Sequence, residues 1–421
     1  MYLPRVVDQM LADRLSYSGG VLIEGVRACG KTETARAHSS SEVALDSGVP
    51  SVQVALDNDP NLLLEGANPR LIDEWQLEPS LWNIVRREID RRGEKGQFIL
   101  TGSSVPAEDA QRHSGAQRIV RLRMRPMTLA ERRIGDTSVS LQKLFSGAEL
   151  APILDNPFTV SDALDHLAHG GWPTDLESPT NQALAHLTDY VDDLINRDVE
   201  RLDGESRRDP DLMLAVLRSL ARNVASEVSY ATVAKDISGT RTTKPDTVAA
   251  YINALRRLYV VEDQPAWAPH LRSRAKVRQS PKLHFVDPSL ALAIHGASAD
   301  SLRRDLETAG FLFESQVVQH LRVFAEAHGG KVYHYRDSSK REVDAIVQLR
   351  DGRWAAVEIK LGQRQISKAE ESLQSFAEVI DTKKSGAPEF MAIITSDGPV
   401  LQLPSGIVTF PLHAMGSSCS A

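Results

Sequence analysis

The sequence predicts an α/β protein of three successive parts, and three stretches carry that prediction. In VLIEGVRACGKT (residues 21–32), an apolar run leads through a glycine-rich loop to Lys-Thr. Between about 150 and 265, apolar residues recur at helical spacing with charges between them. Residues 339–362 hold two β-like runs around Asp351-Gly352, a strong hairpin signal. We expect a parallel-sheet part, a helical connector, a second α/β part and a tail, at residues 1–150, 151–290, 291–412 and 413–421.

Composition limits the classes of function. The chain has 421 residues, 42% hydrophobic and 25% charged, which suits two or three ordinary globular domains. Its net charge of −7 excludes a global basic field, so nucleic acid must meet a local patch. Cys29 and Cys419 lie far apart, which excludes a disulfide framework and suits a reducing cytoplasm. Asp8 and Asp13 interrupt the N-terminal apolar residues, and no run of about 18 apolar residues follows, so we expect a cytoplasmic protein with no signal peptide and no membrane contact.

The glycine-rich loop has the context of a phosphate-binding loop, because a short apolar strand precedes it and a helix can begin after it. Glycines let backbone N–H groups converge on phosphate oxygens at a helix N-terminus. Lys31 would meet the β- and γ-phosphates, and the Thr32 hydroxyl would ligate Mg²⁺. Cys29 is either an oxidation-sensitive thiol or a small residue that fills a tight loop. The expected nucleotide-contacting residues are Gly25, Val26, Arg27, Ala28, Cys29, Gly30, Lys31, Thr32 and Glu33.

Two later apolar runs end in polar residues that can complete this site. In RLIDEWQ, at the end of a neighbouring strand, Asp73 would hold the metal through water, and Glu74 would polarise the attacking water. In FILTGSS, Thr101 or Ser103 could sense the γ-phosphate, although an ordinary strand exit is the alternative.

The connector contains a possible nucleic-acid-binding module. Residues 229–262 read as helix, turn, second helix and strand, which is the layout of a winged helix. Polar residues near the start of the second helix could enter a major groove: Thr242, Thr243, Lys244 and Thr247. In the alternative, a protein-interaction or lid element, Tyr251, Leu255 and Leu258 are ordinary core. A basic run follows that could neutralise phosphates or form a solvated loop: Arg272, Arg274, Lys276, Arg278 and Lys282.

The C-terminal hairpin brings acidic and basic residues together. Folding it about its turn places Asp344 opposite residues 358–360, where Glu358 and Lys360 share one face. Two carboxylates can hold Mg²⁺, which activates water toward a phosphodiester, while the lysine stabilises developing charge. Glu314, on an upstream helix, could add a metal ligand. A surface hairpin with a salt bridge is the alternative. His334 and Arg336 could line the site or lie on the surface.

Residues 21–135 resemble a AAA-type ATPase of a bacterial and archaeal group that joins this domain to a C-terminal domain of unknown function. The matching pieces are YLPR at 2–5, GVRACGKT at 25–32, RLIDEWQ at 70–76, ILTGSS at 99–104 and SGAQRIVRLRMRPMTLAER at 114–132. In that family the last piece follows a Gly-Arg pair whose arginine reaches a neighbouring nucleotide, but here the glycine and arginine are split as Gly115-Ala116-Gln117-Arg118. Here Arg118 takes that place, Arg121 or Arg123 could serve instead, and a solvated basic strand is the alternative.

The C-terminal part resembles the restriction-endonuclease-like (PD-(D/E)xK) core. Asp344, Glu358 and Lys360 match its signature, and Glu314 matches its helical acidic position. Together the resemblances imply an ATP- and Mg²⁺-dependent ATPase coupled to a nuclease-like domain that engages DNA, a protein partner or further copies of the chain. The alternatives are an ATP-gated, Mg²⁺-dependent DNA nuclease and a non-enzymatic, ATP-dependent switch.

Overall fold

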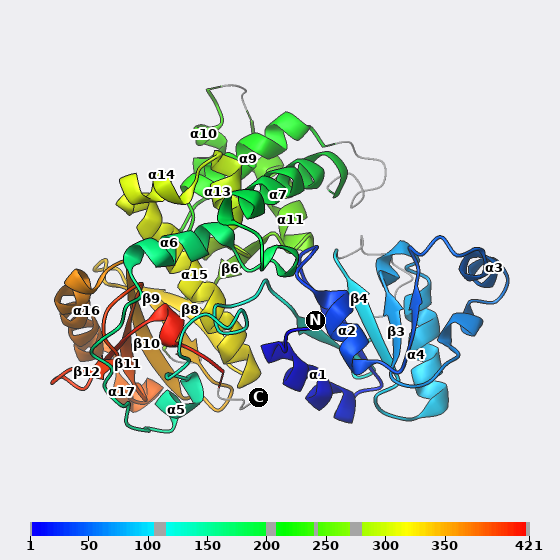
Figure 1. The fold of residues 1–421 in the computed structure, drawn as a ribbon, viewed down its shortest axis with the longest axis horizontal. Helices are drawn as coiled ribbons and strands as arrows, with labels where there is room; N and C mark the ends of the chain where they lie inside the picture. The colour runs from blue at the N-terminus through cyan, green and yellow to red at the C-terminus, as the bar shows by residue number, and fades with distance from the viewer. Residues whose placement is uncertain (1, 105–114, 199–207, 240–242, 270–279, 418–421) are drawn as a thin grey trace.

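The computed structural model describes residues 2–104, 115–198, 208–239, 243–269 and 280–417. The N-terminal sheet lies in one lobe of the molecule, and the C-terminal sheet lies in another beneath a cap of helices (Figure 1). Thr242, Cys419 and the basic run from Arg272 to Arg278 fall outside the described residues.

The N-terminal sheet is parallel, with strand order β2-β3-β4-β1-β5. Its strands are β1 (Gly20–Glu24), β2 (Ser41–Ala44), β3 (Arg70–Asp73), β4 (Phe98–Gly102) and β5 (Ile119–Arg123). Its helices are α1 (Val6–Tyr17), α2 (Lys31–His38), α3 (Pro50–Asn58) and α4 (Leu81–Arg92). The expectation that the Asp73 strand neighbours the loop strand is wrong, because β4 lies between β1 and β3.

Alternate residues of this sheet enter separate cores. Leu22, Ile72 and Leu100 pack on one face with Trp82. The other face, which includes Val21 and its neighbours in β3 and β4, belongs to a hydrophobic cluster that continues through the connector into the C-terminal sheet. The three expected parts therefore share one continuous core.

The connector is helical, as predicted. Its helices are α6 (Val160–His169), α7 (Thr180–Asp193), α9 (Pro210–Arg222), α10 (Tyr230–Asp236), α11 (Pro245–Arg257), α13 (Ser289–His295) and α14 (Ala299–Arg304). After α11, β6 (Val261–Gln264) pairs antiparallel with β7 (Lys282–Phe285), which gives the helix-turn-helix-strand layout. Tyr251, Leu255 and Leu258 are buried, as the core alternative requires, whereas Lys244 and Thr247 are exposed at the start of α11.

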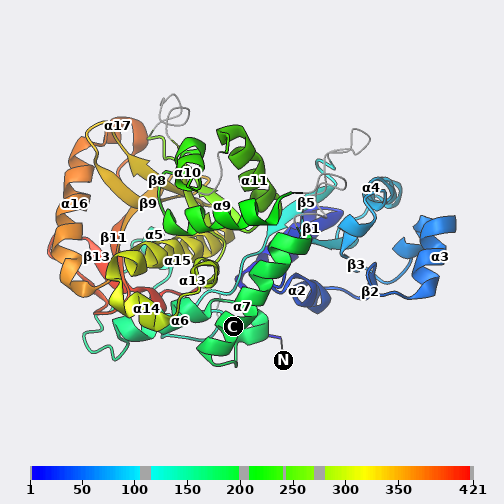
Figure 2. The same ribbon diagram turned by 90° about the horizontal axis from the view of Figure 1, so that it is seen from above.

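The C-terminal sheet is mixed, with strand order β12-β13-β11-β10-β9-β8. Its strands are β8 (Lys331–Arg336), β9 (Glu342–Gln348), β10 (Trp354–Lys360), β11 (Met391–Thr395), β12 (Leu401–Gln402) and β13 (Val408–Pro411). The expected hairpin is confirmed: β9 and β10 pair antiparallel around Gly352, whose φ of 95° suits glycine. Helices α15 (Leu306–Ala327) and α16 (Ile366–Val379) cover opposite faces of the sheet, as Figure 2 shows, and α17 (Thr382–Ser385) follows.

The segment after the N-terminal sheet joins the C-terminal part. Val139 forms a bridge with Met415, and Ile153 forms one with Val400, on either side of the short helix α5 (Leu141–Phe145). The expected boundary at residue 150 therefore falls inside a segment that is bridged to C-terminal residues. The tail expected from residue 413 also starts later, because His413, Ala414 and Met415 are buried. Within the described residues, no helix is both long and apolar enough to cross a membrane.

Candidate functional site

The glycine-rich loop connects β1 to α2 in a conformation that suits phosphate binding. Gly30, directly before α2, has a φ of 99°, in the left-handed region that favours glycine. A Cβ at Gly25 would lie 2.1 Å from the Met124 carbonyl oxygen, so only glycine fits there. Lys31 is buried, and its Nζ donates to the carbonyl oxygens of Gly25 (3.1 Å) and Val26 (2.9 Å). The lysine therefore closes the loop through neutral acceptors.

The predicted acidic partner lies at the same edge of the sheet. Asp73 is buried at the end of β3, and its Oδ1 accepts hydrogen bonds from Thr32 Oγ1 (3.0 Å) and from the Thr101 hydroxyl. The structure thus brings Thr32, Asp73 and Thr101 together. Among the described residues, neither Lys31 nor Asp73 has an ion-pair partner within 4 Å.

Glu74 is held by polar neighbours in a left-handed backbone conformation (φ 55°, ψ 43°). Its N–H donates to Thr101 Oγ1 at 3.1 Å, and its carboxylate accepts from Ser103 Oγ at 3.3 Å and from the Gln76 amide. The Thr101 hydroxyl therefore contacts the carboxylate of Asp73, and the Ser103 hydroxyl contacts that of Glu74. Gln76 was not predicted, and its place two residues after Glu74 is the local signal that could have found it.

The donor set at this edge fits Mg²⁺. Magnesium prefers oxygen ligands and binds one or two protein groups together with phosphates and waters. Thr32 supplies a hydroxyl and Asp73 a carboxylate, 3.0 Å apart. These two residues would hold the ion.

Other residues of the predicted loop set have structural contacts. The Cys29 thiol is buried and lies 3.8 Å from the Met124 carbonyl oxygen, which favours the small-residue alternative. Arg27 pairs with Asp193 of α7 at 3.5 Å, and Glu33 pairs with Arg36 at 2.9 Å.

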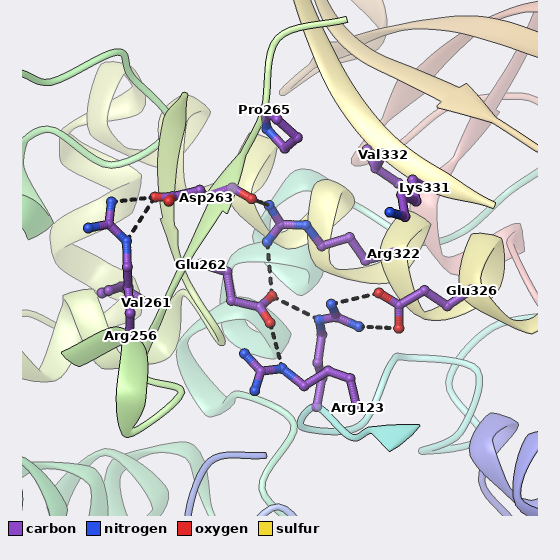
Figure 3. A pocket seen from close by; sticks show the side chains of 11 residues that line it. Arg123, Arg256, Val261, Glu262, Asp263, Pro265, Arg322, Glu326, Lys331 and Val332 are labelled. Atoms are coloured by element: carbon purple, nitrogen blue, oxygen red, sulfur yellow. Dashed lines mark hydrogen bonds and ion pairs between the residues drawn. The ribbon is translucent and has the colours of Figure 1, made fainter. Parts of the chain in front are cut away.

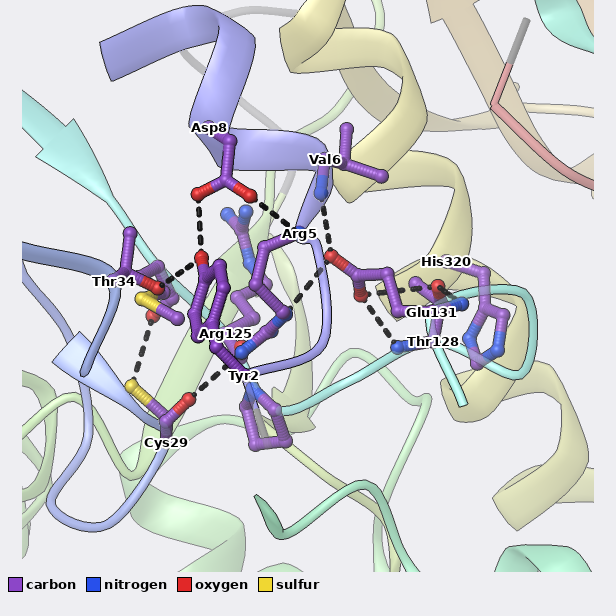
Figure 4. A network of polar contacts seen from close by, with 12 residues as sticks. Tyr2, Arg5, Val6, Asp8, Cys29, Thr34, Arg125, Thr128, Glu131 and His320 are labelled. Atoms are coloured by element: carbon purple, nitrogen blue, oxygen red, sulfur yellow. Dashed lines mark hydrogen bonds and ion pairs between the residues drawn. The ribbon is translucent and has the colours of Figure 1, made fainter. Parts of the chain in front are cut away.

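A cavity of about 240 Å³ lies beside the loop. It is lined by Tyr2, Leu3, Arg5, Gly30, Glu33, Thr34, Met127, Pro173 and Leu176. Arg5, which was not predicted as a site residue, ties this wall to the loop: it donates to the carbonyl oxygens of Cys29 (3.0 Å) and Arg125 (2.8 Å) and pairs with Glu131 at 3.1 Å (Figure 4). The N-terminal segment is thereby fixed against the phosphate loop.

The three candidate arginine fingers all form ion pairs within the chain. Arg118 pairs with Asp90 at 2.9 Å, next to the start of β5 and thus at the sheet edge opposite the phosphate loop. Arg121 pairs with Glu24 at 2.8 Å. Arg123 pairs with Glu262 at 3.0 Å. A finger acting on a neighbouring copy stays a prediction.

An ion-pair joint, buried at Arg125, Glu262 and Arg322, connects the N-terminal sheet to the rest of the molecule (Figure 3). Glu262 of β6 meets Arg123 at 3.0 Å, Arg125 at 2.8 Å and Arg322 of α15 at 3.0 Å. Arg125 also pairs with Glu326 of α15 at 2.9 Å. Burial alone would raise the pKa of Glu262, but the arginine charges hold that pKa far below its usual range. We call these five residues the joint.

The C-terminal hairpin brings Asp344, Glu358 and Lys360 together, as predicted. Lys360 Nζ lies 2.6 Å from Glu358 Oε2 and 3.3 Å from Asp344 Oδ2. Asp344 also accepts from the Ile359 N–H at 2.8 Å, and Glu358 accepts from Ser372 Oγ at 3.1 Å. Burial and the charge of Asp344 raise the pKa of Glu358 to about 8.

Glu314 does not complete a three-carboxylate metal site, contrary to the prediction. Its carboxylate instead pairs with Lys282 Nζ at 2.8 Å, and Lys282 also pairs with Glu342 at 2.7 Å. Among the described residues, no three His, Cys, Asp or Glu side chains are placed to hold a metal ion. We call Lys282, Glu314, Glu342, Asp344, Glu358 and Lys360 the acid–lysine cluster. Only Lys282 and Glu342 in it were missed as site residues.

The other two residues proposed to line this site lie differently. His334 is fully buried, with Nε2 3.2 Å from the Ser280 carbonyl oxygen, so the surface alternative is wrong for it. Arg336 is partly exposed and lies 3.5 Å from Glu227.

Three family models match successive stretches of the chain. Residues 18–132 match the AAA domain family, and residues 160–301 and 309–413 match two domains of unknown function (DUF8612 and DUF4143). The uncharacterized proteins Rv2008c of Mycobacterium tuberculosis and Mb2031c of Mycobacterium bovis are each 26% identical over 345 residues, 81% of this chain and 70% of theirs. AMPPCP-bound DnaA from Aquifex aeolicus is 12% identical over 60% of this chain and 86% of its own, with a TM-score of 0.28, too low to establish a shared overall fold. The N-terminal part of this chain thus has a parallel α/β sheet and is similar to the AAA domain family over residues 18–132.

Proposed function

We propose that this protein binds ATP with Mg²⁺ at the phosphate loop, hydrolyses it, and couples turnover to a nuclease-like C-terminal domain that engages DNA or a protein partner. One observation carries the proposal. Lys31 and Asp73 are both buried at one edge of the sheet, yet they face carbonyl and hydroxyl groups. Buried charges normally have an opposite partner, so a triphosphate and a cation are the expected partners.

Each residue then has a defined task. Lys31 exchanges its carbonyl contacts for the β- and γ-phosphates, while the N–H groups at the start of α2 bind phosphate oxygens. Bound Mg²⁺ would supply charge neutralisation at those oxygens, held by Thr32 and Asp73. Glu74 orients the attacking water once it leaves Gln76 and Ser103. The cavity lined by Tyr2 and Leu3 is the proposed place for the base.

The joint is the proposed route of coupling. Arg125 accepts from Arg5 through its main-chain oxygen, and Arg5 also contacts the phosphate loop at Cys29. The Arg125 side chain binds Glu262 of the connector and Glu326 of α15. A change in the loop would thus reach both later parts of the chain through one buried side chain.

ATP turnover by the wild type, Lys31→Ala and Glu74→Gln tests the ATPase proposal. We expect Lys31→Ala to lose nucleotide binding and Glu74→Gln to keep binding but lose turnover. Lys143→Ala and Glu94→Gln remove exposed groups of the same kind and should behave as the wild type. Full turnover by Glu74→Gln would contradict its role as the base. Tight binding without turnover by the wild type, at any protein concentration, would favour the switch.

A DNA nuclease gated by ATP is the second candidate, favoured by the convergence of Asp344, Glu358 and Lys360. Under it, Asp344→Asn abolishes Mg²⁺-dependent DNA cleavage and leaves ATP turnover intact. Cleavage that survives in Asp344→Asn, or that is absent from the wild type with ATP, would contradict this candidate.

A further inference from the structure

Lys282 is a cation brought to the acid–lysine cluster by a different part of the chain. It is the first residue of β7, in the connector, and its side chain is only 4% exposed. Its Nζ lies 2.8 Å from Glu314 of α15 and 2.7 Å from Glu342 of β9. Burial disfavours the charged lysine, but the charges of Glu314, Asp344 and Glu342 raise its pKa above the usual range. Lys282 is therefore a buried ammonium ion held by carboxylates.

The balance of charge in the cluster depends on this ammonium. Four carboxylates, on α15, β9 and β10, face two lysines, Lys282 and Lys360. Two histidines among the described residues are also close to Lys282. Burial and the charge of Lys282 lower the pKa of His334 of β8 to about 4, and burial and the charges of Arg322 and Lys282 lower the pKa of His284 of β7. Without Lys282, Glu314 and Glu342 would lose the ammonium that neutralises them, and another cation would be favoured in its place.

The element that carries Lys282 is attached to the ATPase domain. Lys282 lies opposite Gln264 in the β6–β7 pair, and the Gln264 side chain donates to the carbonyl oxygens of Tyr333 (3.0 Å) and Asp344 (2.9 Å). Two residues earlier in β6, Glu262 is bound by Arg123 and Arg125 of the ATPase part. The β6–β7 pair thus contacts both the ATPase domain and the acid–lysine cluster.

We propose that Lys282 is an autoinhibitory counter-ion that keeps divalent cations out of the acid–lysine cluster. This inference rests on the proposed nuclease-like role of the C-terminal domain. The lysine occupies the carboxylates of Glu314 and Glu342, so a divalent cation binds the cluster only when the ammonium is removed. Catalysis at the cluster then requires displacement of β7.

Binding of Mn²⁺, followed by the loss of the free-ion electron paramagnetic resonance signal, tests this. An Asp73→Asn background without nucleotide suppresses Mn²⁺ binding at the phosphate loop, because it removes the carboxylate that would hold the ion there. We expect Lys282→Met to bind one Mn²⁺ at least about tenfold more tightly than its parent, because one competing charge is gone. Lys282→Arg keeps the charge and should match the parent. Lys331→Met, which removes an exposed lysine of β8, should also match it.

Two further variants make the result specific. Lys282→Met/Asp344→Asn should lose the added Mn²⁺ affinity, because Asp344 belongs to the cluster. Glu342→Gln serves as a second variant if Lys282→Met fails to fold. The Glu342 side chain is 40% exposed, so its replacement weakens the hold on Lys282 without disturbing the core, and we expect a smaller gain in Mn²⁺ affinity. No gain in either variant, or an equal gain in Lys331→Met, would overturn the inference. ATP turnover is measured at the other site, so failure of the ATPase proposal would appear separately.

Discussion

The phosphate loop and the acid–lysine cluster both bury lysine and carboxylate side chains, but they satisfy those charges differently. Lys31 binds two backbone carbonyl oxygens, and Asp73 accepts from two hydroxyl groups. In the cluster, Lys282 and Lys360 each bind two carboxylates.

This difference separates a site that needs a ligand from one that neutralises itself. Neutral partners can be exchanged for phosphate and metal at small electrostatic cost, because they leave no bare charge behind. Removing an ammonium from the cluster leaves buried carboxylates unpaired, which is far less favourable. Burial of charge is common to both regions, and the kind of partner tells them apart.

The joint offers the largest test, because its central charges, Arg125, Glu262 and Arg322, are buried and paired. Glu262→Ala leaves Arg125 and Arg322 without their shared carboxylate, so we expect the free energy of unfolding to fall by about 3–5 kcal/mol. Urea denaturation measures this, with Glu94→Ala as the exposed control. A loss below about 1 kcal/mol would mean that these pairs contribute no more than surface pairs.

Removing one lysine from each region tests the contrast directly. Lys360→Met should lower the free energy of unfolding by about 1–3 kcal/mol, a value reduced because the side chain is 23% exposed. Lys31→Met should lower it by less, yet weaken binding of an ATP analogue about 10- to 100-fold through lost charge-assisted hydrogen bonds. Denaturation and calorimetry of both variants measure these effects. Equal losses of stability would remove the distinction between the two regions.

The pH dependence of stability tests the cluster alone. Burial, then the charge of Asp344, raises the pKa of Glu314 to about 7 and that of Glu358 to about 8. The folded protein therefore holds protons that the unfolded chain has released, and stability falls as pH rises through about 7 to 8. Glu358→Gln should lose less stability over that range than the wild type. Melting temperatures from pH 6.5 to 9 measure the difference. If the melting temperature of the wild type rose relative to that of the variant as the pH increased, these pKa directions would be wrong.

Arg118→Ala should have the smallest effect on stability. Arg118 and Asp90 are both 42% exposed, so their ion pair should contribute less than about 1 kcal/mol. If Arg118 is the finger for a neighbouring copy, the variant loses the turnover that rises with protein concentration in the wild type. Denaturation together with turnover across a concentration series measures both. Unchanged turnover at high concentration would direct attention to Arg121 and Arg123.

Local patterns made much of the fold and site predictable. The loop around Gly30 and Lys31 is defined within eight residues, and the hairpin around Gly352 follows from its turn. Asp73 and Thr101 were found because polar residues at the ends of parallel strands meet at one edge of the sheet. Each of these signals lies within a few residues of sequence.

Contacts between distant residues left no such signal. Arg5 pairs with Glu131, which lies 126 residues further along the chain, and Arg125 pairs with Glu326, which lies 201 residues further along. In the sequence, Lys282 ends a basic run, which indicates a basic patch. In the structure, its side chain instead pairs with the carboxylates of Glu314 and Glu342. The order of β3 and β4 likewise depends on the whole sheet and not on any single strand.

The pairing of Val139 with Met415 and of Ile153 with Val400 has a consequence for biosynthesis. A ribosome completes residues 18–132 long before it makes Val400 and Met415, the bridge partners of the segment that follows. That segment must wait, unpaired, until residues 400–415 have been made, and long-range pairings of this kind form slowly. Synthesis of residues 400–415 therefore sets the earliest time at which the segment around Val139 and Ile153 can be completed.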